Sequence, residues 1–167
     1  LLDNLFASVN QTLQTFAGDP RWRLNGTLGF IGVLHTWSQT LIDHFHLHCL
    51  VPAGAWSFDT SRWNASRKRY LFRANSLARL FRRIYLQHLK ELYAGHRLRF
   101  YGTTTALADR QAFDRMMAAL RKKQWIVYAK RPFAGPEKVL DYLGRYTHRV
   151  AIANHRLVSM TRETVTF

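Results

Sequence analysis

Cysteine is almost absent from this chain, since Cys49 is the only one among 167 residues. A lone thiol excludes an internal disulfide framework and a zinc ribbon, because each needs several cysteines. The sequence also lacks an apolar run of the roughly 20 residues that a membrane helix requires, and it shows no signal-peptide pattern. These absences favour a reducing compartment, and we expect the protein to be cytoplasmic.

Acidic residues are scarce as well. The chain has 10 Asp and Glu against 25 Lys and Arg, which gives a net charge of +15 and a pI near 10.9. A cationic surplus of this size attracts a polyanion, and nucleic acid is the commonest one. The alternative is a protein that is basic only for solubility. A hydrophobic content of 47% argues against a disordered tail.

Hydrophobic periodicity predicts an α+β fold. Helical patterns cover 2–16, 76–94 and 109–123, and Pro136 opens a further helix that ends near 147. Strand patterns cover 29–37, 44–51 and 125–130. Two further short strand patterns, 149–153 and 156–160, predict a hairpin. We expect one domain over 1–167, an antiparallel sheet with helices packed on it. Because the chain lacks an initiating Met and ends within an apparent strand, we expect a fragment truncated at both ends.

Three histidines alternate along the predicted strand 44–51. Side chains two residues apart share one face of a strand, so His44, His46 and His48 point the same way. Two imidazoles held on a rigid sheet can bind one divalent cation together. The alternative is a solvent-facing strand whose polar residues are histidines by chance. A third ligand must come from elsewhere, and His35, Gln39 and His44 are the nearby candidates.

The donor type of the third ligand bears on the metal. The amide oxygen of Gln39 suits a hard ion such as Mg²⁺ or Mn²⁺, whereas a site made only of histidines favours Zn²⁺. The sequence leaves both open.

Two tyrosines share one face of the last predicted helix. Tyr142 and Tyr146 are four residues apart, so both hydroxyls emerge side by side. Arg145, His148 and Arg149 supply positive charge around them. A phenol ionises near pH 10, and arginines beside a metal-bound phosphate favour the phenolate, which is a competent nucleophile. The alternative is an amphipathic helix whose tyrosines only cover a core.

These motifs together resemble a known family. The runs VLHTWSQ at 33–39, HFHLHCLVP at 44–52 and YLGRYTHRVAI at 142–152 resemble the bacterial two-tyrosine rolling-circle transposases. These belong to the HUH endonucleases, named for a His-hydrophobic-His motif, with replication initiators, relaxases and Helitron transposases. The resemblance covers nearly the whole chain. It implies an RRM-like or ferredoxin-like core with the histidine motif on a central strand, and a cysteine-rich zinc module upstream of the chain.

The resemblance also implies the metal site. The metal-binding pair falls on His46 and His48, with Leu47 as the hydrophobic middle residue. The third ligand of related initiators precedes this strand by several residues and matches Gln39, with His44 as the second choice. The implied cofactor is a divalent metal ion, Mg²⁺ or Mn²⁺.

The same resemblance implies the chemistry. Tyr142 and Tyr146 are the implied nucleophiles, which cut single-stranded DNA, leave a 5′-phosphotyrosine and a free 3′-hydroxyl, and later rejoin strands in rolling-circle transposition. The implied partners are the transposon ends and a target strand, in the bacterial cytoplasm near the nucleoid. The competing functions are a replication initiator or relaxase, a DNA-binding remnant without catalysis, and a zinc hydrolase that uses only the histidines.

Cations and aromatic side chains are the predicted DNA contacts. Exposed Trp63, Tyr70 or Trp125 could stack on bases, although core packing is favoured for Trp125. The triplet Arg67-Lys68-Arg69 fits a DNA contact and a solvated loop equally well. The full predicted set of cationic contacts is Arg67, Lys68, Arg69, Lys130, Arg131, Arg145, His148 and Arg149.

Overall fold

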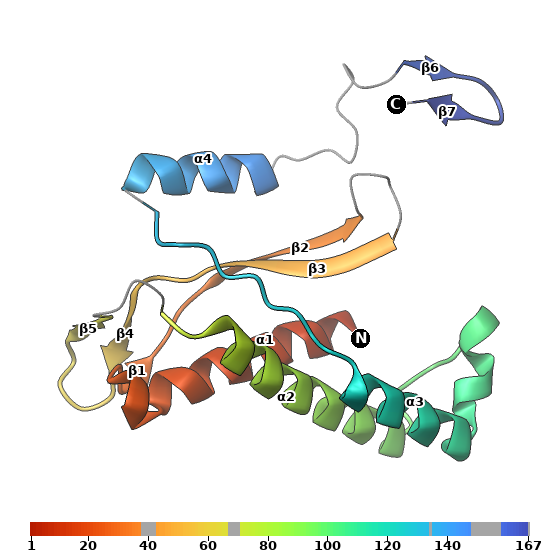
Figure 1. Cartoon of the computed structure of the whole chain (residues 1–167), viewed down its shortest axis with the longest axis horizontal. Helices are drawn as coiled ribbons and strands as arrows, with labels where there is room; N and C mark the ends of the chain where they lie inside the picture. Colours follow the sequence, from red (N-terminus) through yellow and green to blue (C-terminus); the bar gives the residue numbers. More distant parts are fainter. Residues whose placement is uncertain (38–42, 67–70, 134, 148–157, 167) are drawn as a thin grey trace. The chain divides into compact units, whose positions relative to one another are not determined.

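The computed structural model describes residues 1–37, 43–66, 71–133, 135–147 and 158–166. They form an α+β protein whose strands all pair antiparallel, which confirms the predicted fold class (Figure 1). The chain divides into two compact units. The first unit comprises Leu1–Gly29 and Val51–Arg131, and the second comprises Phe30–Leu50 and Pro132–Phe167. A single catalytic domain over the whole chain stays a prediction.

The first unit combines helices with a small sheet. Helix α1 (Leu2–Gly18) packs on α2 (Ala74–Ala94), which also packs on α3 (Arg110–Lys122). Strands β1 (Gly26–Thr27), β4 (Gly54–Ser57) and β5 (Trp63–Ala65) form an antiparallel sheet in the order β1-β4-β5. The 3-10 helices η1 (Pro20–Trp22) and η2 (Gly102–Ala108) lie in the connections.

Local sequence signals explain where α1 and α3 stop or start. Helix α1 ends at Gly18, directly before Asp19 and Pro20, because proline cannot continue a helix. Asp109 caps α3, since its carboxylate accepts a hydrogen bond from the amide of Ala112 at 2.9 Å. Basic residues fill the last turn of α3, where they interact favourably with the helix dipole.

The buried face of α1 includes polar residues beside the apolar Leu13 and Phe16. Leu2 is 43% exposed, whereas Asn4 and Ser8 are buried. The Ser8 hydroxyl donates to the Asn4 side-chain oxygen and also lies 3.1 Å from the Nδ1 atom of His88 on α2. Hydrogen bonds among these groups offset the cost of burying them.

Apolar packing holds α2 against α3. The core cluster there contains Leu86, Leu89, Phe113 and Met117, all at most 7% exposed. The Phe113 ring stacks on Tyr93 with 3.8 Å between ring centroids. A second aromatic group joins the end of α1 to the residues before α2, and its members are Phe16, Trp22 and Phe72.

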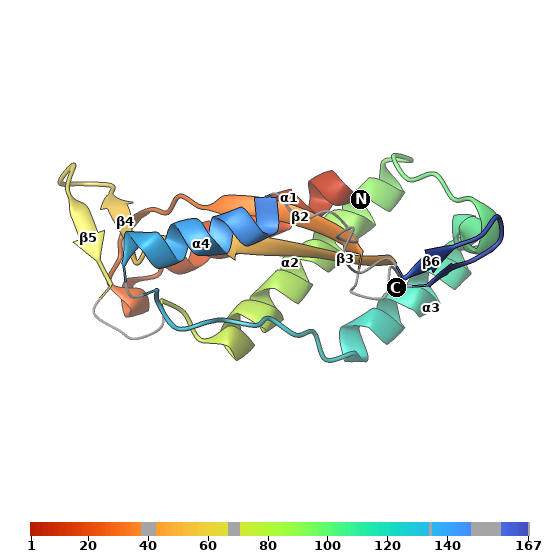
Figure 2. The same cartoon turned by 90° about the horizontal axis from the view of Figure 1, so that it is seen from above.

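The second unit is a hairpin with a helix on it. Strands β2 (Ile31–Trp37) and β3 (Asp43–Leu50) pair antiparallel, and α4 (Pro136–Thr147) runs along this ribbon in Figures 1 and 2. Strands β6 (Ser159–Met160) and β7 (Val165–Thr166) form a second, short hairpin. Pro136 stands at the start of α4 and Glu137 in its first turn, as the sequence predicts.

One predicted strand is wrong. Residues 125–130 do not form a strand among the described residues, although their side chains alternate between half-buried Trp125 and Val127 and exposed Ile126 and Tyr128. Alternation reports which side chains face the protein, but a strand also needs a partner for its backbone hydrogen bonds. Of the predicted terminal hairpin, residues 149–157 lie outside the described residues.

Candidate metal centre and nucleophile helix

Three imidazoles meet on one face of the β2–β3 hairpin. The ring nitrogens of His35, His46 and His48 lie within 4.8 Å of one another, so the three side chains could hold a divalent metal ion. Ring centroids are 5.3 Å apart for His35 and His46, 4.4 Å for His35 and His48, and 4.8 Å for His46 and His48. His35 is buried at 5% exposure, and the other two are half-buried. We call these residues the three-histidine cluster.

Strand register explains why these rings converge. His35 on β2 lies directly opposite His46 on β3, and Val33 lies opposite His48. Directly opposed residues project to the same face of a sheet, as do residues two apart on one strand. Cys49 belongs to the other face, and burial raises the pKa of its thiol to about 11, so it stays protonated at neutral pH.

A backbone contact orients one of the three imidazoles. The Nδ1 atom of His46 lies 2.8 Å from the backbone oxygen of His44. A carbonyl oxygen only accepts, so Nδ1 carries the proton and donates it, which leaves the Nε2 lone pair of His46 available to a metal. The exposed His44 thus orients a cluster member but is not itself one of the three. Gln39 lies outside the described residues, so its assignment as a ligand stays a prediction.

Helix α4 brings a phenol to the same cluster. The hydroxyl of Tyr142 lies 3.2 Å from the Nδ1 atom of His48. The Tyr142 ring packs on Phe133, with 5.1 Å between ring centroids. Tyr142, on α4, and the cluster, on β2 and β3, all belong to the second unit. Of Tyr146, only the helical backbone is described, four residues further along α4.

The other predicted DNA contacts are only partly visible. Lys130 and Arg131 are exposed residues of the first unit. Trp63 is 50% exposed, whereas Trp125 is half-buried and packs on two aromatic rings of α2. The remaining predicted contacts lie outside the described residues, or only their backbone is described: Arg67, Lys68, Arg69, Tyr70, Arg145, His148 and Arg149.

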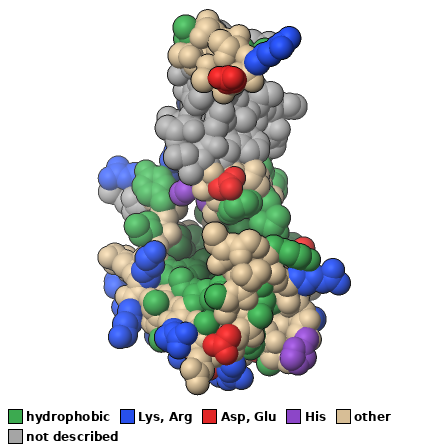
Figure 3. Space-filling view, turned by 90° about the vertical axis from the view of Figure 1, so that its right-hand side faces the viewer, with side chains coloured by type: hydrophobic (Ala, Val, Ile, Leu, Met, Phe, Trp, Pro, Cys, Tyr) green, Lys and Arg blue, Asp and Glu red, His purple; other side chains and the backbone are tan. Residues whose placement is uncertain are grey.

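Charge is strongly segregated along the chain. Nine Lys and Arg and no acidic residue stand between Asp59 and Glu91, and six stand between Asp114 and Glu137. On the face shown in Figure 3, Lys and Arg side chains are widely spread and acidic ones are few. Such a surface attracts a phosphate backbone.

Comparison with known proteins places these features in a family. Residues 29–167 match the family model described as "Putative transposase". The chain is 50% identical over 163 residues to "Putative transposase y4qJ" of Sinorhizobium fredii (strain NBRC 101917 / NGR234). This alignment covers 98% of the chain and 41% of that relative, so the chain spans about two fifths of its length. No solved structure matches. In the part of the chain that the structure describes, no helix is both long and apolar enough to cross a membrane.

Proposed function

Because the chain belongs to the "Putative transposase" family, we propose that it cuts and rejoins single-stranded DNA during rolling-circle transposition. The observation that carries this proposal is the contact between Tyr142 and His48, at the edge of the three-histidine cluster. A nucleophilic hydroxyl next to a site that can hold a metal ion is an arrangement that supports metal-assisted phosphoryl transfer to a side chain. The proposed setting is the bacterial cytoplasm, close to the nucleoid.

The metal would be held by His35, His46 and His48, whose nitrogens converge. Bound there, a divalent ion supplies Lewis-acid polarisation of a phosphate oxygen. Three imidazoles suit Zn²⁺ and the later transition ions better than Mg²⁺. Mn²⁺ remains compatible with the set, and Gln39 is the residue that would favour the harder ions.

His48 and Tyr142 act together in this proposal. If Nε2 of His48 is the ligand atom, Nδ1 carries the proton and donates it to the Tyr142 oxygen. A hydrogen bond donated to that oxygen stabilises negative charge on it and orients it for attack. Packing on Phe133 holds the phenol ring in place.

The strand-cutting step exchanges one phosphoester for another. The Tyr142 oxygen forms a bond to phosphorus, and the bond from phosphorus to the 3′ oxygen breaks. Overall, the phenolic hydrogen ends on that 3′ oxygen, which leaves a 5′-phosphotyrosine and a free 3′-hydroxyl. The number of phosphoester bonds is unchanged, so the 3′-hydroxyl of another strand can reverse the step without ATP.

Tyr146 supplies the second nucleophile of the proposal. Its backbone lies four residues after that of Tyr142 on α4, and residues four apart on a helix are generally neighbours on one face. Two tyrosines allow two strand ends to be held covalently at once, as strand exchange requires.

A covalent adduct is the direct test. The protein is incubated with Mn²⁺ and a 3′-labelled single-stranded DNA pool of random sequence, and the products are separated under denaturing conditions. We expect label to migrate with the protein for the wild type and for the control Tyr128→Phe, whose side chain is 80% exposed. EDTA and the double variant Tyr142→Phe/Tyr146→Phe should each abolish the adduct.

The outcomes separate the competing functions. An adduct that persists in the double variant contradicts the nucleophile assignment. Strand cutting without any adduct supports a hydrolase, and binding without cutting supports a DNA-binding remnant.

A further inference from the structure

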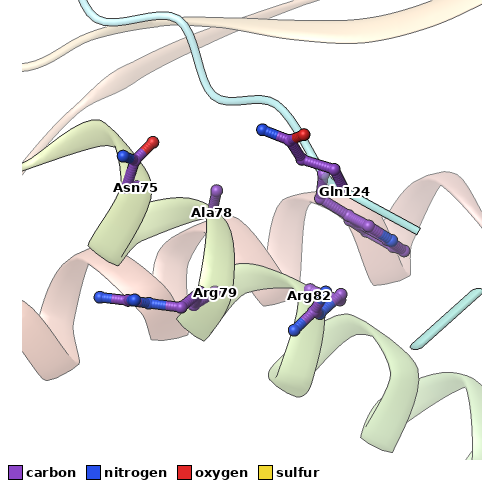
Figure 4. Close-up of a pocket in the computed structure, with 6 residues that line it drawn as sticks. Asn75, Ala78, Arg79, Arg82 and Gln124 are labelled. Atoms are coloured by element: carbon purple, nitrogen blue, oxygen red, sulfur yellow. The ribbon is translucent and has the colours of Figure 1, made fainter. Parts of the chain in front are cut away.

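A separate hollow lies in the first unit, on α2 and the chain that follows α3. Its volume is about 200 Å³. Figure 4 shows Asn75 and Gln124 on either side of Ala78. The helix contributes residues three or four positions apart, which form one face of α2. The lining residues are Asn75, Ala78, Arg79, Arg82, Gln124 and Trp125.

The lining combines two guanidinium groups, two amides and an indole, and it includes no acidic residue. Arg82 is held in place, because its guanidinium donates to the backbone oxygen of Lys123 at 3.0 Å. Among the described residues, no carboxylate forms a salt bridge with Arg79 or Arg82. Within the described structure, therefore, neither cation is neutralised by an ion pair, and each can attract an anion.

Trp125 offers a fixed aromatic surface at this hollow. Its indole nitrogen donates to the backbone oxygen of Leu120 at 3.1 Å. Its ring also packs against Phe81 and Tyr85, with centroid distances of 5.6 and 5.5 Å. The indole is half-buried, so part of its surface is open. A ring held at several points loses little entropy when a second ring stacks on it.

This chemistry matches one nucleotide. We propose that the hollow, which we call the α2 pocket, binds a nucleotide of single-stranded nucleic acid, with its phosphate near Arg79 and Arg82. The base would stack on Trp125, and the amides of Asn75 and Gln124 would hydrogen-bond to its edge. A volume of about 200 Å³ is small for a complete ligand site but suits a single base. Bases of a duplex are stacked on each other, so only an unpaired strand presents one.

The choice of single-stranded DNA as substrate rests on the proposed function, and the pocket adds a place where that strand is held. Because the lining residues all belong to the first unit, the pocket contains none of the cluster histidines and neither nucleophile. Binding and cutting can therefore be measured separately.

Charge-matched variants test the phosphate contact. Arg79→Ala/Arg82→Ala is compared with Arg83→Ala/Lys90→Ala, which removes the same charge from exposed positions of α2 outside the pocket. Affinity for a fluorescent oligothymidylate is measured by anisotropy without divalent metal. We expect a loss of at least about tenfold for the pocket variant and under about threefold for the control. For the pocket variant, the slope of log K against log salt should fall by ~0.7, because the pocket is proposed to hold one phosphate and each neutralised phosphate of a single strand contributes ~0.7.

An oligonucleotide without bases tests the base contact. The wild type should prefer oligothymidylate over an abasic strand of equal length by at least about fivefold, as one stacked base is worth about 1–3 kcal/mol. Asn75→Ala/Gln124→Ala should reduce that preference while leaving affinity for the abasic strand unchanged. Because Trp125→Leu also removes packing, its effect is interpreted only if thermal unfolding shows a folded protein.

Two results would overturn the proposal for the α2 pocket. The first is an equal loss of affinity for oligothymidylate in the pocket variant and the charge-matched control. The second is equal affinity of the wild type for oligothymidylate and for the abasic strand. The adduct assay keeps this outcome distinct from the proposed function. At saturating DNA, Arg79→Ala/Arg82→Ala should still form the adduct, whereas Tyr142→Phe/Tyr146→Phe should bind DNA normally and form none.

Discussion

Replacing His35 by alanine removes one of the three imidazoles that converge on the β2–β3 hairpin. We expect His35→Ala to weaken Mn²⁺ or Zn²⁺ binding by about 100-fold or more, since even the outer partners of metal ligands contribute about 10–100-fold. Isothermal titration calorimetry measures this affinity. The matched control is His44→Ala, because alanine retains the backbone oxygen that lies 2.8 Å from the Nδ1 atom of His46 and removes only the ring of His44, whose centroid lies 4.8 Å from that of His46.

The comparison of these two variants also decides between ligands. If His44→Ala weakens metal binding as much as His35→Ala does, the assignment of His35 rather than His44 as the third ligand is wrong. If neither variant changes the affinity, neither His35 nor His44 is a ligand, and the third ligand beside His46 and His48 lies elsewhere, as Gln39 would.

At the residue scale, spacing groups His44 with His46 and His48 on one strand face, and Tyr142 with Tyr146 on one helix face. The family resemblance, not the spacing, then selects His46 and His48 as the metal pair. The sequence offers His35 only as one candidate among several. The approach of His35 to His46 depends on the pairing register of two strands. A shift of one residue would send His35 to the opposite face, and single-sequence periodicity does not fix that register.

Among the elements, the contact of β1 with β4 depends on a glycine. A Cβ atom added to Gly26 would overlap the backbone carbonyl of Trp56 on β4, which precedes Ser57, the pairing partner of Gly26. Because backbone cannot rotate away as a flexible side chain can, we expect Gly26→Ala to lower the free energy of unfolding by about 1–3 kcal/mol. Urea titration followed by circular dichroism measures this loss.

The control for this prediction is Gly18→Ala at the end of α1, where an added Cβ meets nothing within 4 Å. Alanine favours a helix over glycine by up to about 1 kcal/mol, so Gly18→Ala should be neutral or slightly stabilising. Equal stability of the two variants would contradict the close approach of β1 and β4.

Helices of this chain could be predicted closely, and short strands could not. Capping and stop signals such as Asp109 and Pro20 act locally, and the helices they bound appear where they were expected. The strands β1, β4 and β5 have two to four residues each, too few for alternation to be recognised. Residues 125–130 alternate clearly and still lack a described partner, because pairing depends on residues distant in sequence.

Across the whole molecule, apolar burial is uneven. Among the described residues, every buried hydrophobic side chain belongs to the first unit, and the single buried residue of the second unit is His35. A unit without buried apolar side chains opens more readily, since burial of apolar surface is the main source of stability. The residues proposed for catalysis thus belong to the unit whose described part buries fewer apolar side chains.

Metal binding should therefore stabilise one unit selectively. A metal held by His35 from β2 and by His46 and His48 from β3 would join the two strands. At 100 times its dissociation constant, a ligand stabilises the state that binds it by about 2.7 kcal/mol. We expect Mn²⁺ or Zn²⁺ at that level to slow amide hydrogen exchange in β2 and β3 by about 100-fold, while exchange in α2 and α3 stays unchanged.

Hydrogen exchange followed by mass spectrometry or NMR resolves the two units in one sample. His46→Ala should lose the metal-dependent protection of β2 and β3 and keep the exchange pattern of α2 and α3, because His46 belongs to the second unit. Protection that spreads equally over both units would mean that the metal stabilises the protein as a whole. Protection that persists in His46→Ala would show that the ion binds elsewhere. Only protection confined to the hairpin and lost with His46 fits a metal held by the three-histidine cluster beside Tyr142.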